Sequence, residues 1–299
     1  MARSKTGVHS WEDVLAQRYE NDKPSSLPRY RRRKGTVRGP APRAMDFSQS
    51  PIQQSQCLLL NKLPSELRLM IWEMVLGGRR LHVIQRSQKR LGYVVCPQRD
   101  PCGICRGILP QPIKNAERCS NMNLLSLPAA CKQIYRESIY LLYSSNTFEF
   151  SNTWSLTYLR PTIPADQWNE IRSVDLKWAF PGHWLPSKDS VKSVYVWAGR
   201  QQWVETCKAI LLMKNLEDFT LHLTGNWFGE PIEKVPVFLE PLRGLSLKNH
   251  PHRRWKILLP PQPYYKKAAT KLSDMMQKER IYCEIHEAEQ CKGGCIRPN

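Results

Sequence analysis

Two proline-started segments constrain this chain more than any other feature. The first, residues 63–77, predicts a helix because apolar side chains recur along it at helical spacing. Pro64 suits the first turn of that helix, and a Gly-Gly pair suits its end. The second, residues 128–143, begins the same way and predicts another amphipathic helix. We expect both helices to bury their apolar sides in one interior that includes Met70 and Ile134. The apolar positions of the first helix are Leu67, Met70, Ile71, Met74 and Val75.

Strands and helices alternate in the sequence after residue 147. Short runs of alternating apolar and polar residues predict strands, and longer stretches with one apolar face predict helices between them. Because a strand, a helix and a strand in this order pair in parallel, we expect an irregular β-α array of two or three units, similar to leucine-rich repeats. The predicted fold class is α+β, with a helical N-terminal part ahead of this array. The predicted strands are 81–83, 93–95, 147–150, 171–178, 216–223 and 255–259, and the later helices are 197–213 and 264–285.

Residues 1–55 predict a disordered tail. The segment is rich in proline, serine and glutamine and has few aliphatic residues, so it cannot bury enough apolar surface to offset its ordering entropy. A basic cluster in this tail fits a nuclear import signal or a contact with a polyanion, and a solvated run of charge is the alternative. After the tail we expect a domain over 56–225 and a C-terminal extension over 226–299. The basic cluster comprises Arg31, Arg32, Arg33 and Lys34.

The chain is strongly basic. Its 45 Lys and Arg residues exceed its 26 Asp and Glu residues, which gives a formal net charge of +19. Such a charge favours acidic partners such as nucleic acid, an acidic protein face or anionic lipid, and it is also typical of a basic solvated surface. No apolar run approaches the roughly 18 residues of a membrane helix, and no secretory signal follows the first methionine. We therefore expect an intracellular protein, nuclear or cytoplasmic, that does not enter a membrane.

Ten cysteines suggest metal ligands or free thiols, because a reducing compartment disfavours disulfides. Cys102 and Cys105 have the two-residue spacing with which paired thiolates hold zinc, and Cys96 and Cys119 could complete a four-cysteine site. Unligated loop thiols are the alternative. A second group of possible zinc ligands lies near the C-terminus. The alternative is that these residues are incidental cysteines in a frayed terminus. That cluster comprises Cys283, His286, Cys291 and Cys295.

The sequence carries no recognisable catalytic motif. It lacks Gly-x-Ser-x-Gly, His-Glu-x-x-His and the glycine-rich phosphate loop that ends in Lys-Ser or Lys-Thr. We therefore expect no enzymatic activity, and no cofactor unless zinc is bound. Several tryptophans could stack on bases, although at strand and helix spacing such residues are more often in the core. They are Trp178, Trp184, Trp197, Trp203 and Trp227.

Three marks in the sequence together resemble a fungal family known only as domain of unknown function 7730. The first mark runs from Leu58 through Leu63-Pro64 to Trp72. The second runs from Leu125 through the Cys-Lys-Gln-Ile-Tyr-Arg-Glu-Ser stretch to Phe148, and the third is Ile171-Arg-Ser-Val-Asp-Leu. The resemblance covers residues 57–225 and implies a domain without an assigned activity.

The first two marks also resemble an F-box, in which a Leu-Pro helix is followed by a Cys-Lys element. F-box proteins bind the Skp-type adaptor of a cullin ubiquitin ligase and present a substrate to it. The resemblance implies adaptor contacts at Leu63, Pro64, Leu67 and Ile71, with Cys131 on the supporting helix. This chain departs from a compact F-box by a long insertion between the two elements.

Two functional hypotheses follow from these observations. The first is a non-enzymatic protein-interaction module, in which the Leu-Pro helices bind an adaptor and the β-α array recruits a substrate. The second is a nucleic-acid-associated protein, held by its basic tail and by a small zinc site.

Overall fold

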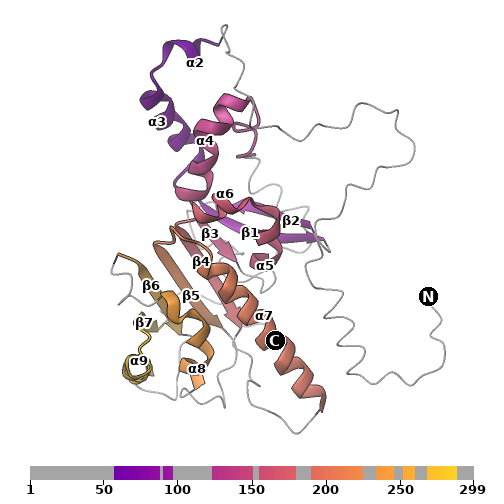
Figure 1. Ribbon diagram of the computed structural model, residues 1–299, viewed down its shortest axis with the longest axis vertical. Coiled ribbons are helices and arrows are strands. Elements are labelled where there is room, and N and C mark those ends of the chain that lie inside the picture. Colours follow the sequence, from indigo (N-terminus) through magenta and orange to yellow (C-terminus); the bar gives the residue numbers. More distant parts are fainter. Residues whose placement is uncertain are drawn as a thin grey trace, which may run out of the picture.

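The strands of the computed structural model form a single sheet within the part of the chain that it describes (Figure 1). Their spatial order is β2-β1-β3-β4-β5-β6-β7. β1 and β2 pair antiparallel, and every other neighbouring pair is parallel. The strands are β1 (Arg80–Ser87), β2 (Arg90–Val95), β3 (Thr147–Phe150), β4 (Ser173–Ala179), β5 (Asp218–Thr224), β6 (Arg254–Leu259) and β7 (Glu284–Glu287). The described residues are 57–87, 90–96, 123–150, 155–179, 190–224, 234–245, 252–259 and 268–287.

Helical segments lie in every connection between parallel strands. The fold is therefore mixed α/β, built on a seven-stranded, mostly parallel sheet. Among the described helices, none is long and apolar enough to cross a membrane. The α-helices are α2 (Leu58–Lys62), α3 (Ser65–Leu76), α4 (Lys132–Ser144), α5 (Ser155–Leu159), α6 (Ala165–Asn169), α7 (Ser190–Leu211), α8 (Val235–Leu239) and α9 (Ala268–Lys278), and the 3₁₀ helices are η2 (Arg160–Thr162) and η4 (Glu240–Leu245).

The sheet is larger than the sequence predicted. The hairpin of β1 and β2 lies between α3 and α4 in the chain, and β1 pairs directly with β3, so the N-terminal part is not purely helical. In the region beyond residue 226, the strand predicted over 255–259 is β6, and β7 is a further strand that the sequence did not predict; both belong to the same sheet. Five consecutive parallel pairings result, where two or three units were expected. The predicted tail over 1–55 and its basic cluster lie outside the described residues.

The helix predicted over 264–285 ends early. α9 stops at Lys278, and the chain turns at Arg280, whose φ of 60° is in the left-handed region. The Arg280 amide donates to the Gln277 carbonyl at 3.0 Å and the Ile281 amide to the Met276 carbonyl at 2.9 Å. These are the two hydrogen bonds of a Schellman motif, which glycine normally closes. The prediction was wrong here because arginine takes the glycine position, and β7 follows instead.

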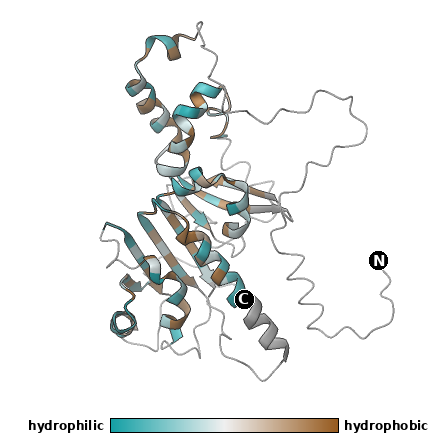
Figure 2. Cartoon of the chain, viewed as in Figure 1, coloured by the Kyte–Doolittle hydropathy of each residue, from teal (hydrophilic) through white to brown (hydrophobic). Residues whose placement is uncertain are grey.

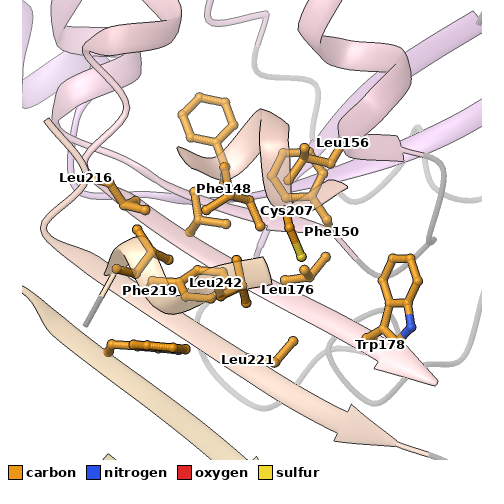
Figure 3. Close-up of a cluster of buried hydrophobic side chains, with 14 of the residues drawn as sticks. Phe148, Phe150, Leu156, Leu176, Trp178, Cys207, Leu216, Phe219, Leu221 and Leu242 are labelled. Carbon is orange, nitrogen blue, oxygen red and sulfur yellow. The ribbon is translucent and has the colours of Figure 1, made fainter. Parts of the chain in front are cut away.

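The core lies between one face of the sheet and the helices (Figure 3). Alternate strand residues such as Phe148, Leu176 and Leu221 point into it and meet side chains of α5, α7, α8 and α9. Trp203 of α7 stacks on Phe238 at 4.2 Å between ring centroids. The core interpretation of the tryptophans is confirmed for Trp178 and Trp203, which are 3% and 0% exposed. Trp184, Trp227 and the side chain of Trp197 lie outside the described part of the structure.

Asn146 joins the N-terminal helices to the sheet. Its side-chain amide donates to the Leu76 carbonyl at 2.8 Å and to the Leu142 carbonyl at 2.9 Å, which are the last turns of α3 and α4. Its Oδ1 accepts from the Arg79 amide at 2.9 Å, immediately before β1. One buried side chain therefore satisfies orphan carbonyls at two helix ends and fixes where the first strand begins. Figure 1 shows α2, α3 and α4 together at one end of the molecule.

Replacing Asn146 should destabilise the whole fold. Asn146→Ala leaves two buried carbonyls and one amide without these hydrogen bonds, so the free energy of unfolding should fall by roughly 2–4 kcal/mol in urea titrations. Ser145→Ala is the matched control, because the contacts of Ser145 here are made by its backbone. A loss for Asn146→Ala no larger than for the control would contradict the role of this clamp.

Candidate docking surface on the N-terminal helices

One side of α3 packs inward through residues spaced four apart. Arg68, Trp72 and Leu76 are buried, and Trp72 joins a small apolar cluster with Leu60 of α2 and with Ile134 and Leu141 of α4. The four-residue spacing keeps these side chains on one face of the helix. The α2–α4 unit therefore has its own core, next to the main core of the sheet.

Glu137 of α4 organises this small core. Its carboxylate accepts from Arg68 Nε at 3.0 Å and from Arg68 Nη2 at 2.7 Å, a bidentate pair. It also accepts from Trp72 Nε1 and from Gln133 Nε2, both at 3.1 Å. The hydrogen bonds from Arg68 outweigh the effect of burial and hold the pKa of Glu137 below its usual value, with Trp72 and Gln133 assisting. Glu137 thus stays ionised and fixes α3 against α4.

Arg68 also reaches the junction of α2 and α3. Its Nη1 donates to the Leu63 carbonyl at 2.6 Å and to the Leu60 carbonyl at 3.1 Å. The guanidinium therefore donates hydrogen bonds to a carbonyl of α2, to the Leu63 carbonyl in the turn and to the Glu137 carboxylate. Burial of a charge in this position is possible because each donor has a partner.

The opposite side of α3 leaves an apolar stripe in solvent. Leu67, Met70 and Met74 follow one another at i, i+3 and i+7, and they are 47%, 60% and 80% exposed. Leu58 of α2 and Val75 of α3 are also exposed, at 68% and 41%. Figure 2 shows brown, hydrophobic residues on α2 and α3 at the end of the molecule away from the sheet. We call Leu67, Met70 and Met74 the α3 stripe.

The expected interior shared by Met70 and Ile134 does not form. Ile134 is buried, whereas Met70 is mostly exposed. The apolar face of α3 that was predicted to be buried therefore faces the solvent. The physical reason is that Arg68 and Trp72 both donate hydrogen bonds to Glu137 of α4. The side of α3 that carries Arg68 and Trp72 therefore faces the interior.

The residues predicted as adaptor contacts lie on or near the same surface. Pro64 and Leu67 are exposed, whereas Leu63 and Ile71 are half-buried. Pro64 is the N-cap of α3, one position before the helix begins. Cys131 lies at the N-cap of α4, where its Sγ accepts from the Ile134 amide at 3.4 Å. Ile71 and Cys131 both pack against the small core, and Cys131 also has the local capping contact.

The two cysteine clusters are only partly described. In the first, Cys96 is buried at the end of β2, and Cys102, Cys105 and Cys119 lie outside the described residues. No group of three or more His, Cys, Asp and Glu side chains placed to hold a metal occurs within the described stretches.

In the second cluster, the two described members point away from each other. Cys283 packs with Ile285 against the main core, where burial raises the pKa of its thiol to about 12. His286 is exposed on the other face of β7, with Nε2 3.5 Å from Glu284 Oε2. Cys291 and Cys295 lie outside the described residues.

A charged cluster that the sequence analysis missed lies on the sheet face away from the core. His82 of β1 pairs with Glu149 of β3, its direct neighbour in register, and both are fully buried. Lys177 of β4 contacts the same carboxylate at 2.8 Å. Arg80, two residues earlier along β1 and on the same face, pairs with Asp175 of β4 at 2.5 Å. The sequence signal was a polar residue at alternate positions of each strand, but the strands that pair are far apart in the chain.

Two cations keep Glu149 ionised inside this cluster. Burial alone would raise the pKa of Glu149, but the hydrogen bonds from His82 and Lys177 outweigh it and lower that pKa to about 2. Burial likewise opposes the charge on His82, yet its contacts with Glu149 and Cys96 raise the pKa of His82 above its ordinary value. Burial lowers the pKa of His222, which lies in β5 in register with Lys177.

The buried pair predicts a defined pH dependence of stability. Glu149 contributes above its unfolded pKa near 4.5, and this contribution disappears as pH falls towards about 2. Wild type should therefore exceed Glu149→Gln by roughly 3 kcal/mol in free energy of unfolding near pH 5.5, and the two curves should converge towards pH 2. His82 contributes fully below pH 6.5, and its contribution is lost as pH rises through its higher folded pKa. Denaturant titrations at several pH values measure this difference.

Glu217→Gln is the matched control for this series, because Glu217 forms an exposed pair with Arg172 at 3.2 Å. Its difference from wild type should stay below about 1 kcal/mol across the same range. A Glu149→Gln curve that runs parallel to wild type from pH 5.5 to pH 2 would contradict the assignment.

Comparisons with known proteins identify a family but no characterised relative. No curated protein matches the chain, and no solved structure matches it either. A family model described as a domain of unknown function, DUF7730, matches residues 52–283. The match begins ahead of α2 and ends just before β7, so it contains α2, α3 and α4, their Arg68–Glu137 pair and most of the sheet. The chain belongs to the DUF7730 family.

Proposed function

We propose that this protein is a non-enzymatic interaction module whose N-terminal helices bind a partner protein. The observation that carries the proposal is the α3 stripe, an apolar surface held outward by the Arg68–Glu137 pair on the opposite side of the helix. Large apolar side chains grouped on one exposed helix face are typical of protein-protein interaction sites.

The energetics of the stripe suit a binding role. Covering one such side chain contributes about 1.5–3 kcal/mol, so Leu67, Met70 and Met74 together could anchor a specific complex even after ordering costs are counted. Met70 and Met74 are flexible and polarisable, which suits a surface that adapts to its partner. Leu58 of α2 and Val75 of α3 are further exposed apolar side chains of the same helical unit.

The partner that fits the sequence resemblance is a Skp-type adaptor of a cullin ubiquitin ligase. The Leu63-Pro64 turn and Leu67 lie at the start of α3, where the F-box resemblance places adaptor contacts, and Ile71 continues them inward. The described part of the insertion between the two helices contributes β1 and β2 to the sheet, and Leu67, Met70 and Met74 are exposed. In this reading the β-α array, similar to a leucine-rich-repeat array, presents the substrate.

Charging the α3 stripe should abolish adaptor binding without unfolding the protein. The variant Leu67→Glu/Met70→Glu places two carboxylates on exposed positions, so the fold should be retained while affinity for a purified Skp-type adaptor falls at least tenfold. Isothermal titration calorimetry on the full chain measures the affinity, and circular dichroism checks the fold. Val237→Glu is the matched control, since Val237 of α8 is 61% exposed and lies away from these helices.

The outcomes separate two parts of the proposal. Absence of binding by the wild-type chain removes the cullin-adaptor role. Binding that survives Leu67→Glu/Met70→Glu, or that falls equally in Val237→Glu, removes the α3 stripe as the docking surface.

A further inference from the structure

The α3 stripe has the spacing of a coiled-coil seam. Leu67, Met70 and Met74 follow one another at intervals of three and four residues, which are the a, d and a positions of a seven-residue repeat. A second helix packs on such a face by inserting its own apolar side chains between those of the first. In this repeat the g positions, which border the seam on one side, are Glu66 and Glu73.

Both g positions carry a carboxylate in solvent. Glu66 and Glu73 are exposed and seven residues apart, so they lie on the same side of α3, two turns from each other. Within the described part of the chain, neither carboxylate forms an ion pair. Arg68, the one basic residue in the sequence of α3, is buried against Glu137. The exposed surface of α3 is therefore acidic, although the chain as a whole is strongly basic.

Helix stability accounts for only one of these carboxylates. Glu66 lies in the first turn of α3, where the helix dipole favours a negative charge. Hydrogen bonds from its own backbone amide and from the Ser65 hydroxyl hold the pKa of Glu66 below its usual value. Glu73 lies in the last turn, where the dipole disfavours a carboxylate. The position of Glu73 therefore has no explanation within the helix, and a cation on a partner would supply one.

We propose that the partner segment seated on the α3 stripe is an amphipathic helix that presents lysine or arginine side chains to Glu66 and Glu73. This inference rests on the proposed docking function and specifies the chemistry of the contact. Apolar side chains of the partner helix cover Leu67, Met70 and Met74, and its cations lie beside the two g positions. Charges that flank an apolar seam in this way select the partner and its orientation.

The charges of α3 argue against two other occupants. In a second copy of this chain packed antiparallel on the same stripe, the g positions of the two helices face each other, so carboxylate opposes carboxylate. In a parallel pair the g positions face the e position, which is Ile71, and that side chain is half-buried against the small core. The same carboxylates repel an anionic membrane surface from this face.

The test uses two synthetic helical peptides as probes. Each peptide has three heptads with leucine at a and d, and one carries lysine at every e and g position whereas the other carries glutamate. Like charges keep either peptide from pairing with itself, so both are added as monomers. Fluorescence anisotropy of the labelled peptide measures its affinity for the full-length chain in about 50 mM salt, where charge interactions are weakly screened.

The lysine peptide should bind the wild-type chain at least about fivefold more tightly than the glutamate peptide, because only its side chains complement the two g positions. The net charge of +19 by itself predicts the reverse order, so the two explanations are distinguishable. The variant Glu66→Lys/Glu73→Lys should invert the preference, because it places cations at both exposed g positions. Circular dichroism checks that this variant keeps its fold.

The variant Glu240→Lys/Asp274→Lys is the matched control. It makes the same change in net charge at exposed positions of η4 and α9, and Figure 1 shows α9 at the other end of the molecule from α3. The preference for the lysine peptide should therefore be the same as in the wild-type chain.

The outcomes separate this inference from the proposed function. Equal or tighter binding of the glutamate peptide, a preference that Glu66→Lys/Glu73→Lys leaves unchanged, or no binding of either peptide would each overturn the basic helix as the occupant. Adaptor binding that is lost in Leu67→Glu/Met70→Glu supports the proposed function whichever result the peptides give.

Discussion

The bidentate pair between Arg68 and Glu137 decides how the N-terminal helices face the solvent. An arginine buried beside a tryptophan must satisfy its donors, and Glu137 with the Leu60 and Leu63 carbonyls provides acceptors for it. Once that side of α3 faces inward, the residues half a turn away face outward. The exposed Leu67, Met70 and Met74 are thus a consequence of a polar interaction, and the proposed docking function depends on it.

The same helices are tied to the sheet through one residue. Asn146 bonds the last turns of α3 and α4 and the chain just before β1, so the orientation of α3 and α4 is tied to the strand that begins beside them. Beyond that junction, the parallel strands bury apolar residues on one face and keep charged residues on the other. The apolar face forms the main core, and the charged face contains the buried pair of His82 and Glu149 together with Lys177.

Local signals in the sequence predicted the elements well and their environment less well. The Leu-Pro start and the glycine end delimited α3, and alternation located β3, β4 and β5, because these signals act over a few residues. Periodicity alone did not show which face of α3 is buried, because both faces carry large apolar side chains and the deciding partner, Glu137, is remote in sequence. The end of α9 was missed because arginine occupies the left-handed position. The Glu149 cluster depends on strand pairing that no local pattern encodes.

Methionine oxidation tests the central claim most directly. Four methionines report on the two environments, because Met70 and Met74 are 60% and 80% exposed whereas Met213 and Met276 are each 1% exposed. Under brief treatment of the native chain with hydrogen peroxide, quantified by peptide mass spectrometry, Met70 and Met74 should oxidise at least about tenfold faster than Met213 and Met276. Protection of Met70 and Met74 equal to that of the two core methionines would show that this face of α3 is turned inward and would contradict the account.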